Sequence, residues 1–235
     1  MKVFKYLLIF TFLVFSISCV YNDLNRDYYL LSPDESLSFT FHSDEQKISY
    51  SLKKNNQLLI EKSLLGILTD QFDLSDDLTV DKVQRSRNNE TWTQIWGEQK
   101  HITDNHNELA IYLSSKTNQM KMIIRFRLFN DGLGFRYELP EQNEMNEFKI
   151  LDELTEFNFS EDSQSWWIPA YSYRRFEFLY ANTLISDISR DTYSDLVEDL
   201  TGPRLGPEAV HTPFTVQRND GICIAIHEAN LTNYS

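Results

Sequence analysis

Charged side chains lie within the most aromatic stretch of the chain, residues 165–180, which reads SWWIPAYSYRRFEFLY. Arg174, Arg175 and Glu177 are embedded there among tryptophan, tyrosine and phenylalanine. A carboxylate in apolar surroundings must be paired or bound to a cation, because an unsatisfied buried charge costs several kcal/mol. The residue types therefore leave two chemistries open for Glu177: an ion pair with a neighbouring arginine, or ligation of a metal ion.

Tryptophan and histidine side chains form a second candidate group. Trp92 and Trp96 could stack on pyranose rings, since their faces are large and apolar, but tryptophan in a β-sandwich is more often buried. We therefore expect both in the core. His101 and His106 fall in a predicted loop and turn region without a third ligand at metal spacing, so we expect a surface or supporting role for them.

An acidic tract between residues 64 and 81 carries five aspartates at irregular intervals. A calcium loop needs Asp or Asn at alternate positions and a glycine that turns the backbone. Here the spacing is irregular and no glycine follows. The tract is therefore expected to be a solvated loop.

The N-terminus has the pattern of an export signal. Lys2 and Lys5 precede an apolar and hydroxyl run that ends at Ser18 and is too short to span a bilayer. We predict that residues 1–18 are a signal peptide and that Cys19, which follows small residues, receives a lipid. Ordinary signal-peptide cleavage near the same point is the alternative. The expected location is the periplasm or, as a lipoprotein, the outer membrane of a Gram-negative bacterium, with membrane contact only through the lipid anchor.

The remaining cysteine and the charge narrow the class of protein. Cys223 lies in the apolar run ICIAI and has no partner, so it is expected to be a small buried hydrophobe. A formal net charge of −13 argues against nucleic-acid binding and against electrostatic docking on anionic lipid.

Alternating apolar and polar residues predict strands along most of the chain. Residues 28–61 read as a β meander with three turns, and further strands are expected over residues 148–159, 214–216 and 221–227. Residues 191–200 are a candidate short helix. The fold class is therefore all-β and antiparallel with few short helices.

The clearest local pattern is a hairpin over residues 122–139. A two-residue loop at Asp131 and Gly132 suits the twist of the strands. This register would place Arg127 opposite Arg136, and like charges in that position are unfavourable. We therefore expect an acidic side chain from elsewhere in the chain against this pair; a solvated hairpin face is the alternative.

Several short motifs occur in a specific order and spacing. They are SPD at residues 32–34, LGI at 65–67, WTQIWGE at 92–98, NEL at 107–109, the hairpin, WIP at 167–169 and HEANL at 227–231. Together they resemble the N-terminal domain of glycoside hydrolase family 97, the α-glucosidase and α-galactosidase family of bacterial glycan utilisation. The resemblance implies that residues 25–235 form one β-super-sandwich domain similar to the galactose mutarotase-like fold.

The resemblance also implies a function. In that family a glutamate at the position of Glu177 reaches a catalytic (β/α)₈ barrel and helps to ligate calcium beside the oligosaccharide substrate. Glycosidases need a pair of carboxylates across the scissile bond, and the resembled family carries them in the barrel, which these 235 residues do not include. We therefore assign no catalytic residue and expect no hydrolysis by this chain alone. A stand-alone carbohydrate-binding module, or an aldose epimerase using a His and Glu pair, are the alternatives.

Overall fold

The computed structural model describes residues 26–44, 47–142, 147–170, 178–189 and 208–230. Its regular elements are β-strands, all paired antiparallel, and one 3₁₀ turn, η1 (Ile185–Asp187). The predicted all-β antiparallel class is confirmed. Within these residues, none of the helical structure is long and apolar enough to cross a membrane. The candidate helix at residues 191–200 lies outside the described ranges.

The first sheet is the predicted meander. Its strands, in sheet order, are β1 (Arg26–Leu31), β2 (Leu37–Ser43), β3 (Ile48–Lys54) and β4 (Gln57–Leu64). Burial alternates along β2, as expected for a strand with one face on a core. Asn55 and Asn56 both adopt positive φ in the turn between β3 and β4, a conformation that asparagine tolerates.

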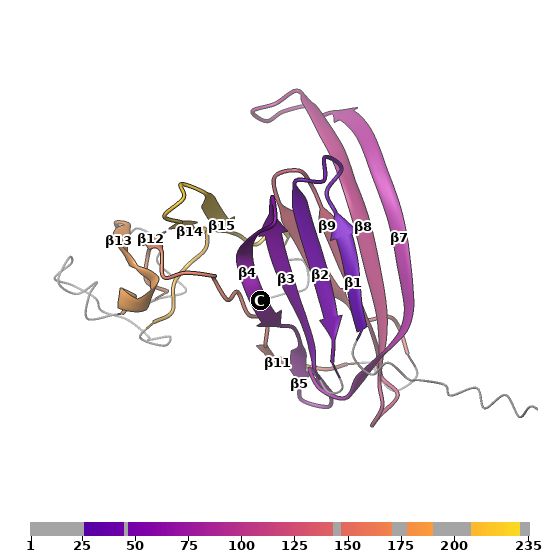
Figure 1. Ribbon diagram of the computed structural model, residues 1–235. Helices are drawn as coiled ribbons and strands as arrows, with labels where there is room; N and C mark the ends of the chain where they lie inside the picture. The colour runs from indigo at the N-terminus through magenta and orange to yellow at the C-terminus, as the bar shows by residue number, and fades with distance from the viewer. Residues whose placement is uncertain (1–25, 45–46, 143–146, 171–177, 190–207, 231–235) are drawn as a thin grey trace, which may run out of the picture.

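The second sheet packs against the first and closes the sandwich (Figure 1). Its order is β10 (Leu133–Glu138), β9 (Lys121–Leu128), β8 (His101–Ser115) and β7 (Leu78–Thr93). Phe39 of the first sheet meets Phe126 of the second with ring centroids 4.4 Å apart, and both side chains are fully buried. Burying a side chain of this size contributes about 1.5–3 kcal/mol. The core is thus built from the inward faces of both predicted strand sets.

The predicted hairpin forms, but with a different register. Leu128 lies opposite Leu133, so the loop is four residues long and is closed by the Phe129 N–H donating to the Gly132 carbonyl at 2.8 Å. Arg136 consequently lies opposite Arg125 and not, as predicted, opposite Arg127. A shift by two residues keeps every apolar side chain on the same face, so the hydrophobic pattern cannot distinguish the two registers.

Three short strands form a small sheet at one end of the sandwich. They are β5 (Ile67–Thr69), β6 (Asp73–Leu74) and β11 (Ile150–Glu153). The acidic tract is therefore not simply a loop, because β5, β6 and the start of β7 lie within it. The strand predicted over residues 148–159 is shorter than expected: beyond β11 the Glu156 N–H still donates to the Leu64 carbonyl, but no continuous ladder forms.

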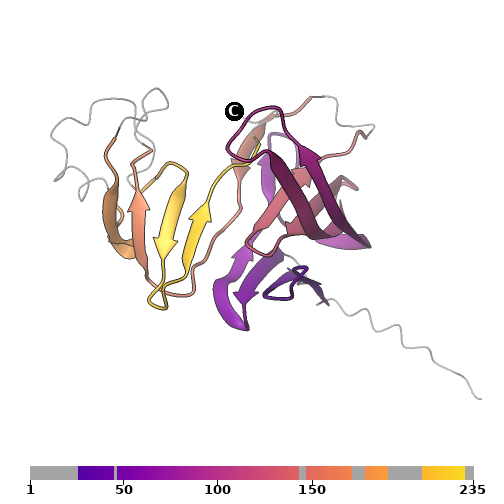
Figure 2. The same cartoon turned by 90° about the horizontal axis from the view of Figure 1, so that it is seen from above.

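The last sheet stands beside the sandwich, as Figure 2 shows. It contains β13 (Ala181–Leu184), β12 (Gln164–Trp167), β14 (Phe214–Gln217) and β15 (Cys223–Ile226), in that order. It has a small core of its own, formed by Trp167, Ala181, Phe214 and Val216. The strands predicted near residues 214–216 and 221–227 are confirmed.

Candidate functional site

Glu177, the candidate metal ligand, and Cys19, the candidate lipidation site, lie outside the described residues, so their roles stay predictions. The chain on either side of Glu177 is described. The Ala170 N–H donates to the Ala209 carbonyl at 2.8 Å, and Phe178 packs against the core of the β12–β15 sheet. Leu179 is exposed. The described residues that flank Glu177 are therefore placed, Ala170 beside Ala209 and Phe178 against this core.

A calcium site needs more oxygen ligands than one glutamate supplies, since calcium takes six to eight. Within the described ranges, no group of three or more His, Cys, Asp or Glu side chains is arranged to hold a metal ion. The calcium role of Glu177 therefore stays a prediction.

A network of arginines and glutamates covers the outer face of the second sheet. Glu108 on β8 accepts from Arg125 Nη1 at 2.7 Å and from Arg127 Nε at 2.9 Å. The expected acidic partner of Arg127 is therefore present and comes from the neighbouring strand. Burial by itself would raise the pKa of Glu108, but the hydrogen bonds from Arg127 and Arg125 outweigh it and lower the pKa.

A second glutamate neutralises the arginine pair that the observed register creates. Glu138 accepts two hydrogen bonds from Arg125, at 2.7 and 3.1 Å, and one from Arg136 Nε at 2.7 Å. The Arg125 bond is the main reason why the pKa of Glu138 is lowered. Because both carboxylates are held ionised by arginines, neither is suited to donate a proton at neutral pH. The network stabilises the sheet and does not form an acid–base pair.

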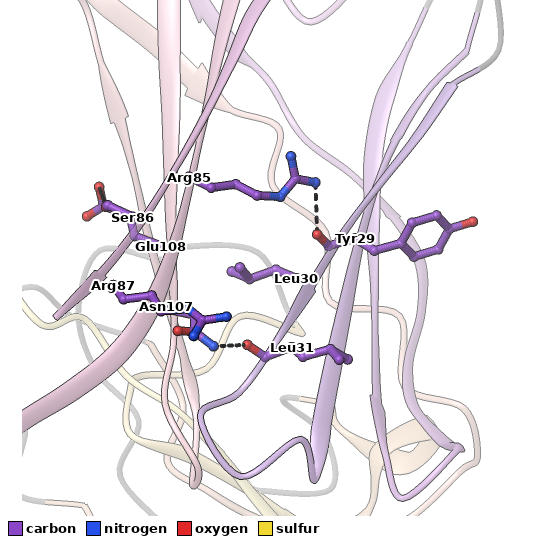
Figure 3. A pocket seen from close by; sticks show the side chains of 8 residues that line it. All are labelled: Tyr29, Leu30, Leu31, Arg85, Ser86, Arg87, Asn107 and Glu108. Atoms are coloured by element: carbon purple, nitrogen blue, oxygen red, sulfur yellow. Dashed lines mark hydrogen bonds between the residues drawn. The ribbon is translucent and has the colours of Figure 1, made fainter. Parts of the chain in front are cut away.

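A hollow of about 340 Å³ lies between β1 and the β7–β8 strands (Figure 3). Arg85 donates to the Tyr29 carbonyl at 3.1 Å, and Asn107 donates to the Leu31 carbonyl at 2.7 Å. These contacts occupy backbone acceptors along the free edge of β1, which protects the edge from pairing with another strand. The carboxylate in the lining is Glu108, already bound by arginines. The hollow therefore lacks the carboxylate pair that glycoside hydrolysis requires.

The structure corrects the expectation for Trp92 and Trp96. Their side chains are 49% and 88% exposed, so neither belongs to the core. The reason is the length of the β7–β8 hairpin. β9 accompanies β8 only as far as Asn107, whereas β7 and β8 continue to pair up to Thr93 and His101. Figure 1 shows the rest of the hairpin projecting past the ends of the neighbouring strands.

The two histidines lie on a strand and not in a loop, because β8 begins at His101. His101 is exposed and contacts Thr93 Oγ1 at 3.2 Å, as expected for a surface role. His106 is buried, bonds to the Asp104 carboxylate and packs on the Phe129 ring at 5.1 Å between centroids. It supports the fold at the base of the projecting hairpin.

The expectation for Cys223 is also wrong. Its thiol is exposed. β15 is the edge strand of the last sheet, and Cys223 and Ala225 are its exposed residues, alternating with half-buried Ile224 and Ile226. An apolar run does not show which residues face the core when the strand lies at an edge.

Comparison with known proteins adds to this geometry. The family model described as Glycosyl-hydrolase 97 N-terminal matches residues 30–235. A curated relative, a retaining alpha-galactosidase of Bacteroides thetaiotaomicron, is 20% identical over 227 residues, which are 95% of this chain and 32% of the relative.

Solved structures give the same picture. A glycoside hydrolase family 97 enzyme of Pseudoalteromonas sp. strain K8, solved with panose and with acarbose, is 33% identical with a TM-score of 0.75; the match covers 87% of this chain and 28% of that one. A beta-arabinopyranosidase shares the fold at 21% identity and a TM-score of 0.67, over 82% of this chain and 30% of its own. The chain thus spans about a third or less of the length of these relatives.

Proposed function

The chain belongs to the glycoside hydrolase 97 N-terminal family, and from this premise we propose that it is the non-catalytic β-sandwich part of an exported α-glycosidase. The observation that carries the proposal is the family match over residues 30–235. The length of the relatives supports the proposal, because this chain spans only 28–32% of their chains. In this proposal the carboxylates that cleave the substrate belong to a catalytic barrel domain with which the sandwich works.

The proposed substrate class is α-linked glucosides or galactosides. One relative is a retaining alpha-galactosidase, and another was solved with panose and with acarbose. The sandwich would contribute one ligand, the Glu177 carboxylate, to a calcium ion beside the substrate. Support for this role comes from the described residues that follow Glu177: Phe178 packs against the core of the β12–β15 sheet, whereas Leu179 and Tyr180 are exposed.

A chimera tests the proposal. Residues 26–235 replace the matched region of the Pseudoalteromonas enzyme, and hydrolysis of panose is followed at several calcium concentrations. We expect the chimera to be active and Glu177→Gln to lower its rate and raise the calcium concentration it needs. Glu61→Gln, at an exposed position on β4, is the matched control and should change neither. A folded but inactive chimera argues against the proposed function, and an unchanged Glu177→Gln argues against the ligand role alone.

The chain on its own is proposed to be inactive. Purified chain should release no nitrophenol from α-glucoside or α-galactoside substrates above the level of its Glu177→Gln variant. Hydrolysis clearly above that level would overturn this part of the proposal.

Export and lipidation at Cys19 are a separate proposal that rests on the leader. Expressed with its leader in a Gram-negative host, the protein should carry a diacylglyceryl-modified Cys19 in the mass spectrum of its N-terminal peptide. Cys19→Ser should abolish the modification. An unmodified mature terminus in the unaltered protein would show ordinary signal-peptide cleavage instead.

A further inference from the structure

The β7–β8 hairpin ends in an exposed apolar tip. Ile95 and Trp96, in the loop, are 101% and 88% exposed and are the two most exposed large apolar side chains of the described residues. Trp92 adds a half-exposed ring at the end of β7. Figure 1 shows this hairpin projecting past the ends of the neighbouring strands. Exposed apolar clusters of this kind mark sites of association.

Hydrogen bonds within the hairpin hold the tip in a defined shape. The Gln94 N–H donates to the Lys100 carbonyl at 3.1 Å and closes the loop. Below it, the hydroxyls of Thr91 and Thr103 bond across the ribbon at 3.0 Å. An isolated two-stranded ribbon is only marginally stable in water. These cross-strand bonds stabilise a ribbon that presents its apolar residues in a fixed arrangement.

We propose that this tip is a docking element that binds the catalytic domain of the parent glycosidase. The inference rests on the proposed function and extends it to a specific interface. A protein partner fits the chemistry better than a sugar, because Ile95 offers no ring to stack on a pyranose, whereas tryptophan is enriched at the hot spots of protein interfaces. The relatives contain enough additional chain to supply the partner, since this chain spans only 28–32% of them.

The test measures thermal midpoints in two proteins, the 235-residue chain and the chimera with the Pseudoalteromonas enzyme. Trp96→Ala and Ile95→Ser should leave the midpoint of the chain unchanged, because the side chains are in water there. In the chimera each should lower the midpoint by about 2 °C or more, since a packed contact is lost. Leu151→Ser, at an apolar residue of β11 that is 61% exposed, is the control away from the tip and should leave both midpoints unchanged.

Three results would overturn the docking proposal. Equal shifts in both proteins would show that the tip residues act only on their own hairpin. Concentration-dependent dimers of the chain that disappear in Trp96→Ala, seen by sedimentation, would make a second copy the partner. Quenching of tryptophan fluorescence by maltoheptaose, lost in Trp96→Ala, would make the tip a carbohydrate site. The midpoint reports on docking whether or not the chimera is active, so failure of this inference is distinct from failure of the proposed function.

Discussion

At Glu108, burial and hydrogen bonding act in opposite directions on one carboxyl group. Burial favours the neutral form, but donors from Arg127 and Arg125 favour the ionised form and lower the pKa overall. A group whose pKa is lower in the folded state stabilises the fold above its unfolded pKa. That contribution is lost as the pH falls through the folded-state pKa.

We therefore predict that acid weakens the sandwich partly through this residue. The free energy of unfolding, measured by urea titration at a series of pH values, should fall below about pH 4.5, the ordinary value for a glutamate. Glu108→Gln should be less stable at pH 7 and should lose less on acidification. Glu61→Gln, with an exposed side chain, should follow the parent curve. A Glu108→Gln curve parallel to the parent would contradict the assignment.

Tyr137 connects the β9–β10 hairpin to the small sheet. Its hydroxyl accepts from the Gly66 N–H at 3.1 Å. Because the Thr155 hydroxyl donates to Glu153, the Tyr137 hydroxyl must donate to Thr155 Oγ1, at 2.7 Å. Burial raises the pKa of Tyr137 to about 12.

Tyr137→Phe should cost about 1–3 kcal/mol of unfolding free energy, because the Gly66 N–H loses the oxygen that it donates to. Tyr112→Phe is the control, since that hydroxyl makes an exposed contact with Gln84 at 3.2 Å, and its effect should be within about 0.5 kcal/mol. Equal losses in the two variants would show that the buried hydrogen bonds do not matter.

The wrong predictions of burial have one physical cause in common. Trp92, Trp96 and Cys223 are apolar residues in strand-like patterns, and burial was inferred from residue type alone. Burial depends on whether another layer covers the strand at that point. The overhang of β7–β8 and the edge position of β15 are properties of sheet topology, which local alternation does not encode.

At the level of strands, β5 and β6 lie so close together that the position just before β5 requires a glycine, Gly66. A Cβ on Gly66 would lie 2.4 Å from Ser75 Cβ and 2.8 Å from Ser75 Cα, so the backbone would have to shift. Gly66→Ala should therefore destabilise the chain by about 1–3 kcal/mol. Gly134 on β10 has open space around its Cα, so Gly134→Ala should be neutral or slightly stabilising. Similar midpoints for both variants in thermal unfolding would contradict this contrast.

The strands also show how much of the fold can be predicted from the sequence. The meander and the hairpin were predictable because alternation and the turn residues pointed to the same strands. The hairpin register was not, because two registers that differ by two residues bury the same face. The arginine network was half predictable: like charges required an acid, but only the pairing of β8 with β9 shows that Glu108 supplies it. Glu177 was reached only through a family resemblance.

For the whole molecule, the unequal size of the two cores predicts which part unfolds locally first. The sandwich core draws on both large sheets, whereas among the described residues the core of the β12–β15 sheet consists of four buried apolar side chains. Several contacts join them, including Ile222 and Ile224 packed against the sandwich core. Phe159 packs on both cores and meets Phe214 at 6.0 Å between centroids, and Arg218 donates to the Leu58 carbonyl at 3.1 Å. Regions with fewer buried apolar contacts open at lower free energy.

Hydrogen exchange should therefore be faster in β12 and β14 than in β8 and β9, and peptides resolved by mass spectrometry measure this. Phe159→Ala should accelerate exchange in β12–β15 further and have less effect on β8 and β9, because it removes a contact between the cores. Phe157→Ala is the matched control, since Phe157 packs against Tyr50 and Phe135 of the sandwich. Equal exchange free energies in all four strands would mean that the molecule opens as one unit.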